Sequence, residues 1–284
     1  MTNHQQQRAF LSLLIRPQNL SEEEIAQALS KILPTDLYTL RTQLKAIPPN
    51  IIAPLPPQSA TNAINLLQQL GCAAFAPTTE QIAALGPTTK IKHLRLTTSG
   101  LQIETWRQGS TTINPDNIEI LIQAKITESH KKKSFSSGSH PGFAGPFGST
   151  PLDWVSHDLH TGIQSNNWNT SAGVQPHKSN IHADHKLDIH TTQGKIFQID
   201  SAKFAFEFLG KDRDLSVRIN MNQTTDFFKS LAPNAALDTY FDSFNAPPTS
   251  RNFHATNSTI NKDNPTFAFY SRWAALVYRY LAQQ

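Results

Sequence analysis

The most regular hydrophobic pattern in this 284-residue chain lies between Lys186 and Leu209. Leu187 and Ile189 alternate with polar residues up to Gln193-Gly194, and a second alternation follows. Its apolar positions are Phe197, Ile199, Phe204, Phe206 and Phe208. A period of two is typical of half-buried β-strands, and a glycine between two such runs favours a tight turn. The pattern predicts strands through Leu209, with a phenylalanine face that meets the Trp273 side of the last helix.

The first part of the chain shows helical periods between short apolar runs. Phe10 to Ile15 predicts a buried strand. Ser21 with Glu24 forms a capping box before a helix that Pro34 ends, and Asp36 caps a second helix. Two helices therefore follow the first strand.

The same region continues with a strand, a third helix and a last strand. Ile51 to Leu55 is a short apolar run between prolines, and Ser59 begins a helix with an apolar stripe. Gly71 stands where a left-handed C-terminal cap is needed, before a strand over Cys72 to Ala76. Residues 8–77 are thus expected to form a β-α-α-β-α-β sandwich.

This segment resembles the C-terminal domain of bacterial ribosomal protein L7/L12. The resemblance lies in the short second helix over Asp36 to Ala46, in IPPNIIAPLPP after it, and in SATNAINLLQQLGCAAFA. It implies the fold of that domain. The family's factor-binding surface is rich in lysine and glycine, whereas this chain has Glu22, Glu23 and Glu24 there, so no role in translation is carried over.

Residues 78–89 predict a linker, because Gly86-Pro87 interrupts any regular pattern. Alternating strands follow around Ser99-Gly100, at Thr111 to Ile113 and at Ile118 to Ile126. The run HLRLTTSGLQIETWRQGSTTINPDNIEILIQAKI looks like the opening of a PH- or GRAM-like module. Residues 90–284 are therefore expected to form an antiparallel PH-like β domain, and the fold class is α+β.

Two further segments complete this second domain. Residues 131–181 are rich in Ser, Gly, Pro and Asn and predict a disordered insertion between strands. Asn264-Pro265 begins a C-terminal amphipathic helix, since proline suits the first helical position. Its apolar stripe includes Phe269, Trp273 and Val277. In a PH-like domain such a helix closes the open end of the barrel.

Composition narrows the function only slightly. Lys and Arg number 25 against 21 Asp and Glu, a net charge of +4 without concentration on one segment, which makes nucleic acid an unfavoured partner. Cys72 is the only cysteine, so no intrachain disulfide can form and the cytoplasm is the expected compartment. The N-terminal apolar run is short for a signal peptide, and no apolar stretch approaches transmembrane length.

Histidine and aspartate cluster in the middle of the chain. Imidazole and carboxylate groups bind zinc or copper, so the two His-rich pairs are weak metal candidates against the alternative of a polar loop. These candidates are His157, His160, His182, Asp184 and His185. Without a second shell to orient them, ligands on a loop make a poor site, so we expect no metal and no cofactor.

Catalytic motifs are weak in this sequence. Ser156, His157 and Asp158 are adjacent and cannot form a hydrolytic triad, and no Gly-x-Ser-x-Gly elbow, Walker loop or Rossmann glycine pattern occurs. Asp212 and Asp214 alternate with basic residues and are typical of a self-neutralising turn. The sequence favours a protein without catalytic residues, with a metal-dependent or hydrolytic enzyme as the third alternative.

Aromatic residues and a lysine run in the insertion are the strongest candidates for binding. Aromatic side chains in polar sequence can anchor a partner, and the lysines can add charge attraction. The candidates are Lys131, Lys132, Lys133, Phe143, Phe147, Trp154 and Trp168. The alternatives are that the aromatic residues pack over the sheet and that the lysines are solvated. The sequence predicts a scaffold or binding protein that recognises a protein partner; PH-like binding to an anionic lipid through Lys90, Lys92, Arg95 and these lysines is the alternative.

Overall fold

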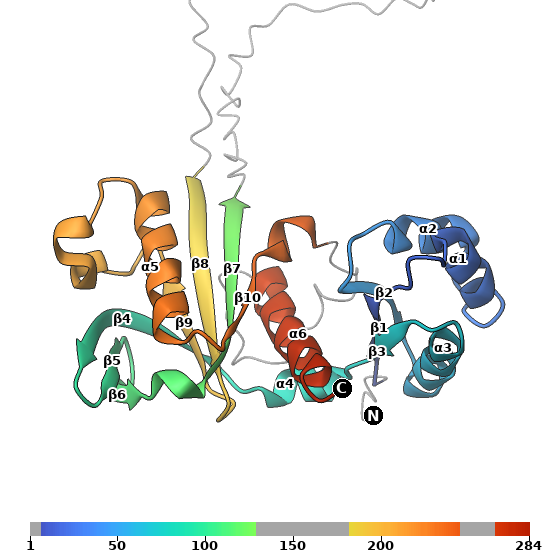
Figure 1. The fold of residues 1–284 in the computed structure, drawn as a ribbon, viewed down its shortest axis with the longest axis horizontal. Coiled ribbons are helices and arrows are strands. Elements are labelled where there is room, and N and C mark those ends of the chain that lie inside the picture. Colours follow the sequence, from blue (N-terminus) through green and yellow to red (C-terminus); the bar gives the residue numbers. More distant parts are fainter. Residues whose placement is uncertain (1–6, 129–181, 245–264) are drawn as a thin grey trace, which may run out of the picture. The chain divides into compact units, whose positions relative to one another are not determined.

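The computed structural model describes residues 7–128, 182–244 and 265–284 (Figure 1). Within them the chain is of the α+β class. The predicted insertion 131–181 lies outside the described residues. The chain divides into two units, residues 128–182 and the rest, and the elements described here belong to the second of them. Among the described helices, none is long and apolar enough to cross a membrane.

The first six elements have the predicted order β-α-α-β-α-β. They are β1 (Ala9–Ile15), α1 (Glu22–Ser30), α2 (Leu37–Leu44), β2 (Asn50–Leu55), α3 (Pro57–Gln69) and β3 (Ala73–Phe75). The strands pair in the order β2-β1-β3, both times antiparallel. The capping signals hold, since Ser21 and Glu24 form the capping box, Asp36 accepts from Thr39 N, and Gly71 has φ +77°.

The small sheet carries apolar residues on both of its faces. Leu11 and Leu13 of β1 join a core with α1, α2 and α3, which includes Ile25, Leu40 and Leu67. The alternate residues of β1 point the other way, as the period of a strand requires. Phe10 and Leu14 therefore belong to a second core, which forms around the C-terminal helix α6 (Pro265–Leu281).

Residues 78–89, predicted as a linker, contain a helix. Thr78 and Gln81 form a capping box at the start of α4 (Thr79–Ala84). Ile82 of this helix is fully buried and packs in the core of α6 together with Leu85. The helix was missed because its apolar stripe is only one turn long.

The second sheet is mixed, which corrects the expectation of an antiparallel sheet. Within the described ranges its strand order is β10-β7-β8-β9-β4-β5-β6, and β4 pairs in parallel with β9, as β10 does with β7. Its strands are β4 (Thr88–Thr97), β5 (Gly100–Thr105), β6 (Gly109–Ile113), β7 (Ile118–Glu128), β8 (His182–Thr191), β9 (Ile196–Asp200) and β10 (Ala236–Asp238). The predicted hairpins are present, but β10, too short to show a period, completes the sheet.

The phenylalanine run after β9 is not a strand. Asp200 ends β9, because its carbonyl accepts from Lys203 N and Phe204 N while its Oδ1 accepts from Ala202 N. The chain then enters the 3₁₀ helix η2 (Phe206–Asp212). Phe204 and Phe206 remain buried, with ring centroids 5.0 Å apart in edge-to-face contact. The alternation therefore reflected burial of a turn rather than a β-strand.

Different helices cover the two faces of the central strands, as Figure 1 shows for α5 and α6. Leu187 and Phe197 pack against α5 (Val217–Leu231) through Met221 and Phe228. The phenylalanine face therefore meets α5, not the Trp273 side of the last helix as expected. The alternate residues of β8, Lys186, Asp188 and His190, are buried as well. They were expected to lie at the exposed face of a half-buried strand, but α6 covers that face.

Helix α6 is buried on all sides along most of its length, and four consecutive side chains bond to four different segments. Tyr270 Oη donates to Asp238 Oδ1 in β10, and Ser271 Oγ to Asp188 Oδ2 in β8. Arg272 Nη2 donates to Gly86 O before β4, and Trp273 Nε1 to Ser12 Oγ in β1. Since successive helical residues point about 100° apart, these bonds surround the helix. The C-terminal helix thus joins both sheets.

Candidate binding site

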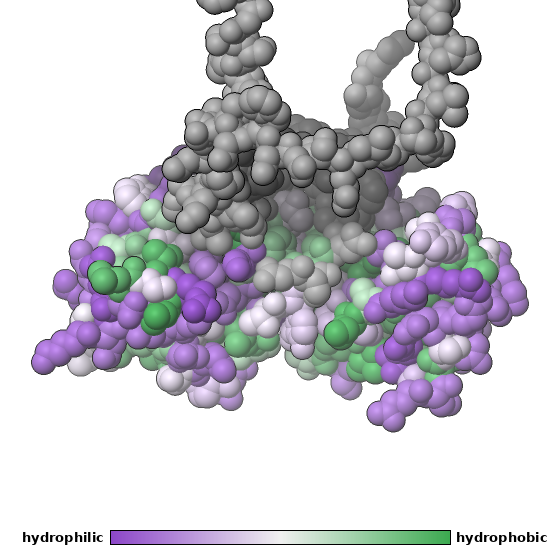
Figure 2. Space-filling view, turned by 90° about the horizontal axis from the view of Figure 1, so that it is seen from above, coloured by the Kyte–Doolittle hydropathy of each residue, from purple (hydrophilic) through white to green (hydrophobic). Residues whose placement is uncertain are grey.

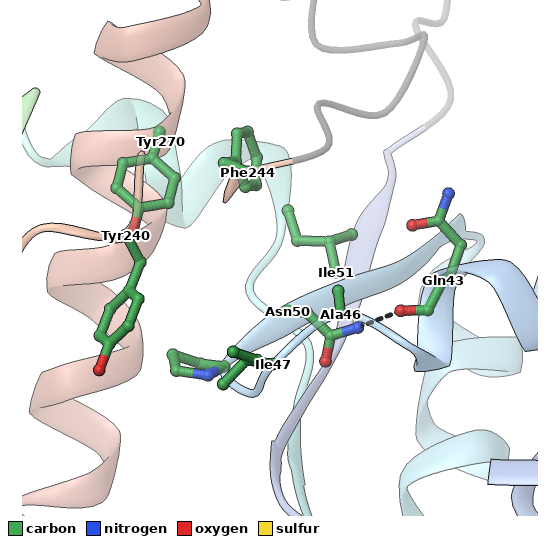
Figure 3. A pocket seen from close by; sticks show the side chains of 9 residues that line it. Gln43, Ala46, Ile47, Asn50, Ile51, Tyr240, Phe244 and Tyr270 are labelled. Carbon is green, nitrogen blue, oxygen red and sulfur yellow. Dashed lines mark hydrogen bonds between the residues drawn. The ribbon is translucent and has the colours of Figure 1, made fainter. Parts of the chain in front are cut away.

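A pocket lies where the turn between α2 and β2 faces η3 (Tyr240–Ser243) and α6 (Figure 3). Its volume is about 60 Å³. Apolar and aromatic side chains form most of its wall; these are Ile47, Pro49, Ile51, Tyr240, Phe244 and Tyr270. Figure 3 shows Tyr240, Phe244 and Tyr270 on one side, opposite Ile47, Asn50 and Ile51. The pocket is therefore built from segments that are far apart in the sequence.

Local structure holds both walls in place. Helix α2 ends at Leu44, and β2 begins at Asn50 after the two prolines Pro48 and Pro49. Asn50 Nδ2 donates a 2.7 Å hydrogen bond to Gln43 O, which closes this turn. On the other side, Asp238 Oδ1 accepts from the backbone N–H of Tyr240 and fixes the start of η3.

Behind the aromatic wall lies a buried pair of titratable groups. Tyr270 Oη donates a 2.7 Å bond to Asp238 Oδ1, while Asp238 Oδ2 has no hydrogen-bond partner among the described residues. Burial raises the pKa of Tyr270, and the Asp238 carboxylate raises it further. Burial also raises the pKa of Asp238, against the lowering effect of the Tyr270 hydrogen bond. Tyr270 therefore stays a neutral donor at physiological pH.

One polar acceptor in the wall is unsatisfied. Asn50 is only 7% exposed, and its Oδ1 has no hydrogen-bond partner in the part of the chain that the structure describes. Among the described residues that line the pocket, none is charged at neutral pH. The pocket can therefore take an apolar side chain, and a nearby N–H donor on the ligand would satisfy Asn50.

A serine, a histidine and an aspartate do meet in the interior, under α6. Ser271 Oγ donates a 2.6 Å bond to Asp188 Oδ2, and His190 Nε2 lies 2.8 Å from the same Oγ. Since the hydroxyl proton points to Asp188, His190 Nε2 is the donor in the second bond. A hydrolytic triad needs the opposite arrangement, in which histidine accepts the serine proton. Ser271 and Asp188 are also fully buried, so this cluster holds α6 on the sheet.

Arg272 brings a positive charge to the same cluster. Its guanidinium donates to the carbonyls of Ala268 and Gly86 and to Thr88 Oγ1, and its Nε lacks a partner among the described residues. Burial raises the pKa of Asp188, while Ser271, Gln198 and Arg272 oppose the rise. Burial lowers the pKa of His190 to about 3, with smaller contributions from Arg272 and Arg279. The histidine is therefore neutral.

The predicted metal residues are not brought together where they can be located. His157 and His160 lie outside the described residues. Asp184 and His185 are neighbours on β8 and so point to opposite faces of the sheet, with His185 buried. His182 belongs to the same strand. Among the residues described, no group of three His, Cys, Asp or Glu side chains could hold a metal ion.

The predicted binding residues, and the adjacent serine, histidine and aspartate considered as a triad, lie outside the described residues. They are Lys131, Lys132, Lys133, Phe143, Phe147, Trp154 and Trp168, with Ser156, His157 and Asp158. Asp212 and Asp214 can be placed, and Asp214 Oδ1 accepts from Ser216 N. Asp214 therefore stabilises this turn through a backbone hydrogen bond, and the charge neutralisation read from the sequence stays a prediction.

Basic residues on β4 are partly neutralised. Lys92 Nζ lies 3.1 Å from Glu104 Oε1 and 5.8 Å from the ring centroid of Trp106. His93 Nδ1 lies 3.5 Å from Glu207 Oε2. A bulge in β4 between Ile91 and His93 lets Ile91 and Leu94 both point into the core, three positions apart. Lys92 and His93 of β4 therefore lie beside acidic side chains at the partly exposed face of the strand.

The pocket residues were not identified from the sequence. Ile47 and Pro49 belong to the IPPN run and Ile51 follows it, and an isoleucine directly before two prolines could have marked the turn as a surface. Nothing along the chain connects that turn with Tyr240 or Phe244. Comparison with models of known protein families, with curated proteins and with solved structures gives no match, so the two resemblances stay predictions.

Proposed function

We propose that this chain is a non-enzymatic binding protein of the cytoplasm that recognises a protein partner. The partner would place an apolar side chain in the pocket between the α2–β2 turn and α6. Recognition of this kind uses an apolar anchor in a pocket, surrounded by contacts that exclude water.

The observation that carries this proposal is the exposure of apolar side chains at the mouth of the pocket. Ile47 is 75% exposed and Tyr240 is 49% exposed, and both line the same pocket. A single exposed isoleucine would need no explanation. Two large apolar side chains at one concave site, together with the unsatisfied acceptor of Asn50 in the same lining, favour a partner that covers them.

Charge supports a protein partner rather than an anionic lipid. The residues that line the pocket carry no charge at neutral pH. Of the three basic residues of β4 expected to contact a lipid head group, Lys90, Lys92 and Arg95, Lys92 pairs with Glu104. A lipid surface is recognised by concentrated positive charge, and this part of the sheet mixes both signs.

Capture by the full chain and by two matched variants tests the proposal. Ile47→Asp places a charge at the pocket mouth, and Ile32→Asp places the same charge at another surface site, where Ile32 is 44% exposed. Partners retained by the native chain and by Ile32→Asp should be lost with Ile47→Asp. A chain without residues 131–181 should keep the same partners, because the pocket lies outside that segment. Equal capture by all variants would remove the pocket from recognition.

Liposome co-sedimentation completes the design. Vesicles with and without anionic lipid should leave the native chain in the supernatant equally. Sedimentation that depends on anionic lipid would favour the lipid alternative over a protein partner.

A further inference from the structure

The loop between η2 and α5 presents an unusually exposed apolar side chain. Leu215 is 105% exposed, which means that it contacts no more of the protein than it would in an extended peptide. Val217 and Ile219, at the start of α5, are 43% and 38% exposed. In Figure 2 apolar surface gathers at the end that carries η2 and α5 in Figure 1. This loop therefore displays an apolar group that the fold itself does not bury.

Hydrogen bonds hold the residues on both sides of Leu215. Asn220 is 3% exposed, and its carboxamide accepts from Asp214 N at 2.7 Å and donates to Asp214 O at 2.8 Å. Asp214 Oδ1 in turn accepts from Ser216 N at 2.7 Å. A rigid loop loses little conformational entropy when it binds, so a fixed leucine makes a better anchor than a mobile one.

From these two features we infer that Leu215 of one copy of this chain occupies the Ile47–Tyr240 pocket of a second copy. The inference rests on the proposed function, since it uses the same pocket. One water needs roughly 10–15 Å³ of such volume, so the pocket of about 60 Å³ holds a few water-sized groups. The number of water-sized groups that fit in the pocket is therefore close to the four carbon atoms of a leucine side chain. The full exposure of Leu215 shows that it does not occupy the pocket of its own chain.

Polar groups on the two surfaces also match. The N–H groups of Asp214 and Ser216 are used within the loop. The N–H of Leu215 donates to no other described residue, whereas Asn50 Oδ1 lacks a donor. A leucine that enters the pocket therefore brings a donor toward an acceptor that is otherwise unpaired, which removes a desolvation penalty.

The contact joins two different patches and is therefore heterologous. One anchor and one pocket bury much less than the roughly 1,200 Å² of a stable standard-size interface. Association is thus weak and concentration-dependent, and each copy keeps a free leucine at one end and a free pocket at the other. A stronger partner with a similar anchor would displace it.

Sedimentation velocity of the full chain over a range of concentrations tests this contact. The native chain should show a larger mean mass as its concentration rises. Leu215→Ser and Ile47→Asp should each remain monomeric, because each lacks one half of the contact. A mixture of these two variants should form a one-to-one complex, since one supplies the pocket and the other the leucine.

The controls are Leu96→Ser and Ile32→Asp, which change exposed apolar residues outside both surfaces and should associate like the native chain. A native chain that stays monomeric at every concentration overturns the inference. So does a mixture of the two variants that fails to associate, because that result indicates a contact between identical patches. Leu215→Ser should still capture the partners of the native chain, so the failure of self-association leaves the proposed function in place.

Discussion

Ser271 on α6 donates a 2.6 Å hydrogen bond to Asp188 on β8, and the two residues are 83 positions apart in the chain. Both are fully buried. Ser271→Ala removes the donor to Asp188 Oδ2 and leaves His190 Nε2 without an acceptor, while Asp188 Oδ1 keeps its hydrogen bond from Gln198 Nε2. We therefore expect a loss of about 1–3 kcal/mol in the free energy of unfolding. Urea denaturation measures it. Ser230→Ala, which removes an exposed hydroxyl from α5, should change stability by under about 0.5 kcal/mol. Equal effects would contradict the role given to Ser271.

The lowered pKa of His190 predicts that the free energy of unfolding falls in acid. Its pKa in the folded chain is lowered from 6.5 to about 3 by burial, so the unfolded chain binds more protons between these values. The contribution of neutral His190 to the free energy of unfolding is complete above pH 6.5. It falls by up to about 1.4 kcal/mol per pH unit as the pH drops toward 3. His190→Gln keeps a donor for Ser271 and does not titrate.

Asp188 acts in the opposite direction, since its pKa is raised and its contribution to stability increases as the pH falls through that value. The difference between the native chain and His190→Gln isolates the histidine. Unfolding free energies measured from pH 7 to pH 4 should show a steeper decline for the native chain. Parallel curves would mean that His190 is not held neutral.

Trp273 and Ser12 connect α6 with the small sheet. Ser12 Oγ accepts from Trp273 Nε1 at 2.9 Å and donates to Phe10 O at 2.8 Å. Ser12→Ala leaves the indole N–H unpaired in the core and should lower the free energy of unfolding by about 1–3 kcal/mol. A double-mutant cycle with Trp273→Phe should show coupling, because the second change removes the unpaired donor. Additive effects would argue against this bond.

Gly100 and Gly109 make a matched pair on β5 and β6. Both have positive φ, but a Cβ at Gly100 would lie 2.8 Å from Ile113 O, whereas one at Gly109 would meet nothing within 4 Å. Gly100→Ala should therefore lower the free energy of unfolding by about 1–3 kcal/mol more than Gly109→Ala does, and should lower the melting temperature further. Differential scanning calorimetry compares them. Equal losses would show that the backbone angle alone decides the effect.

The sequence predicted local structure better than the sides on which elements pack. Ser21, Asp36 and Gly71 marked the helix ends correctly, because a cap depends only on neighbouring residues. The polar residues Asp188 and His190 were expected near solvent, since a period of two cannot tell water from a helix that supplies hydrogen bonds. The turn at Asp200 ended the strand before Phe204, although the alternation continued.

The candidate site could not be predicted because its walls come from distant segments. Ile47 and Tyr240 face one cavity, but no pattern in the sequence relates them. Leucine is likewise a residue type expected in a core. Leu215 is fully exposed only because it lies on a loop held by Asn220. Such properties arise from tertiary packing and are visible only once the fold is known.

The position of α6 in the chain has a consequence for synthesis. The ribosome makes β1 and the strands β4 to β10 before this helix, yet Phe10, Ile120 and Ile122 pack in the core that α6 completes. A nascent chain that has not yet reached Pro265 can form the helical side of the small sheet, whose core is separate. The apolar sides that pack against α6 stay open to water until this helix has been made. Until then the unfinished polypeptide exposes apolar strand faces, which favours aggregation.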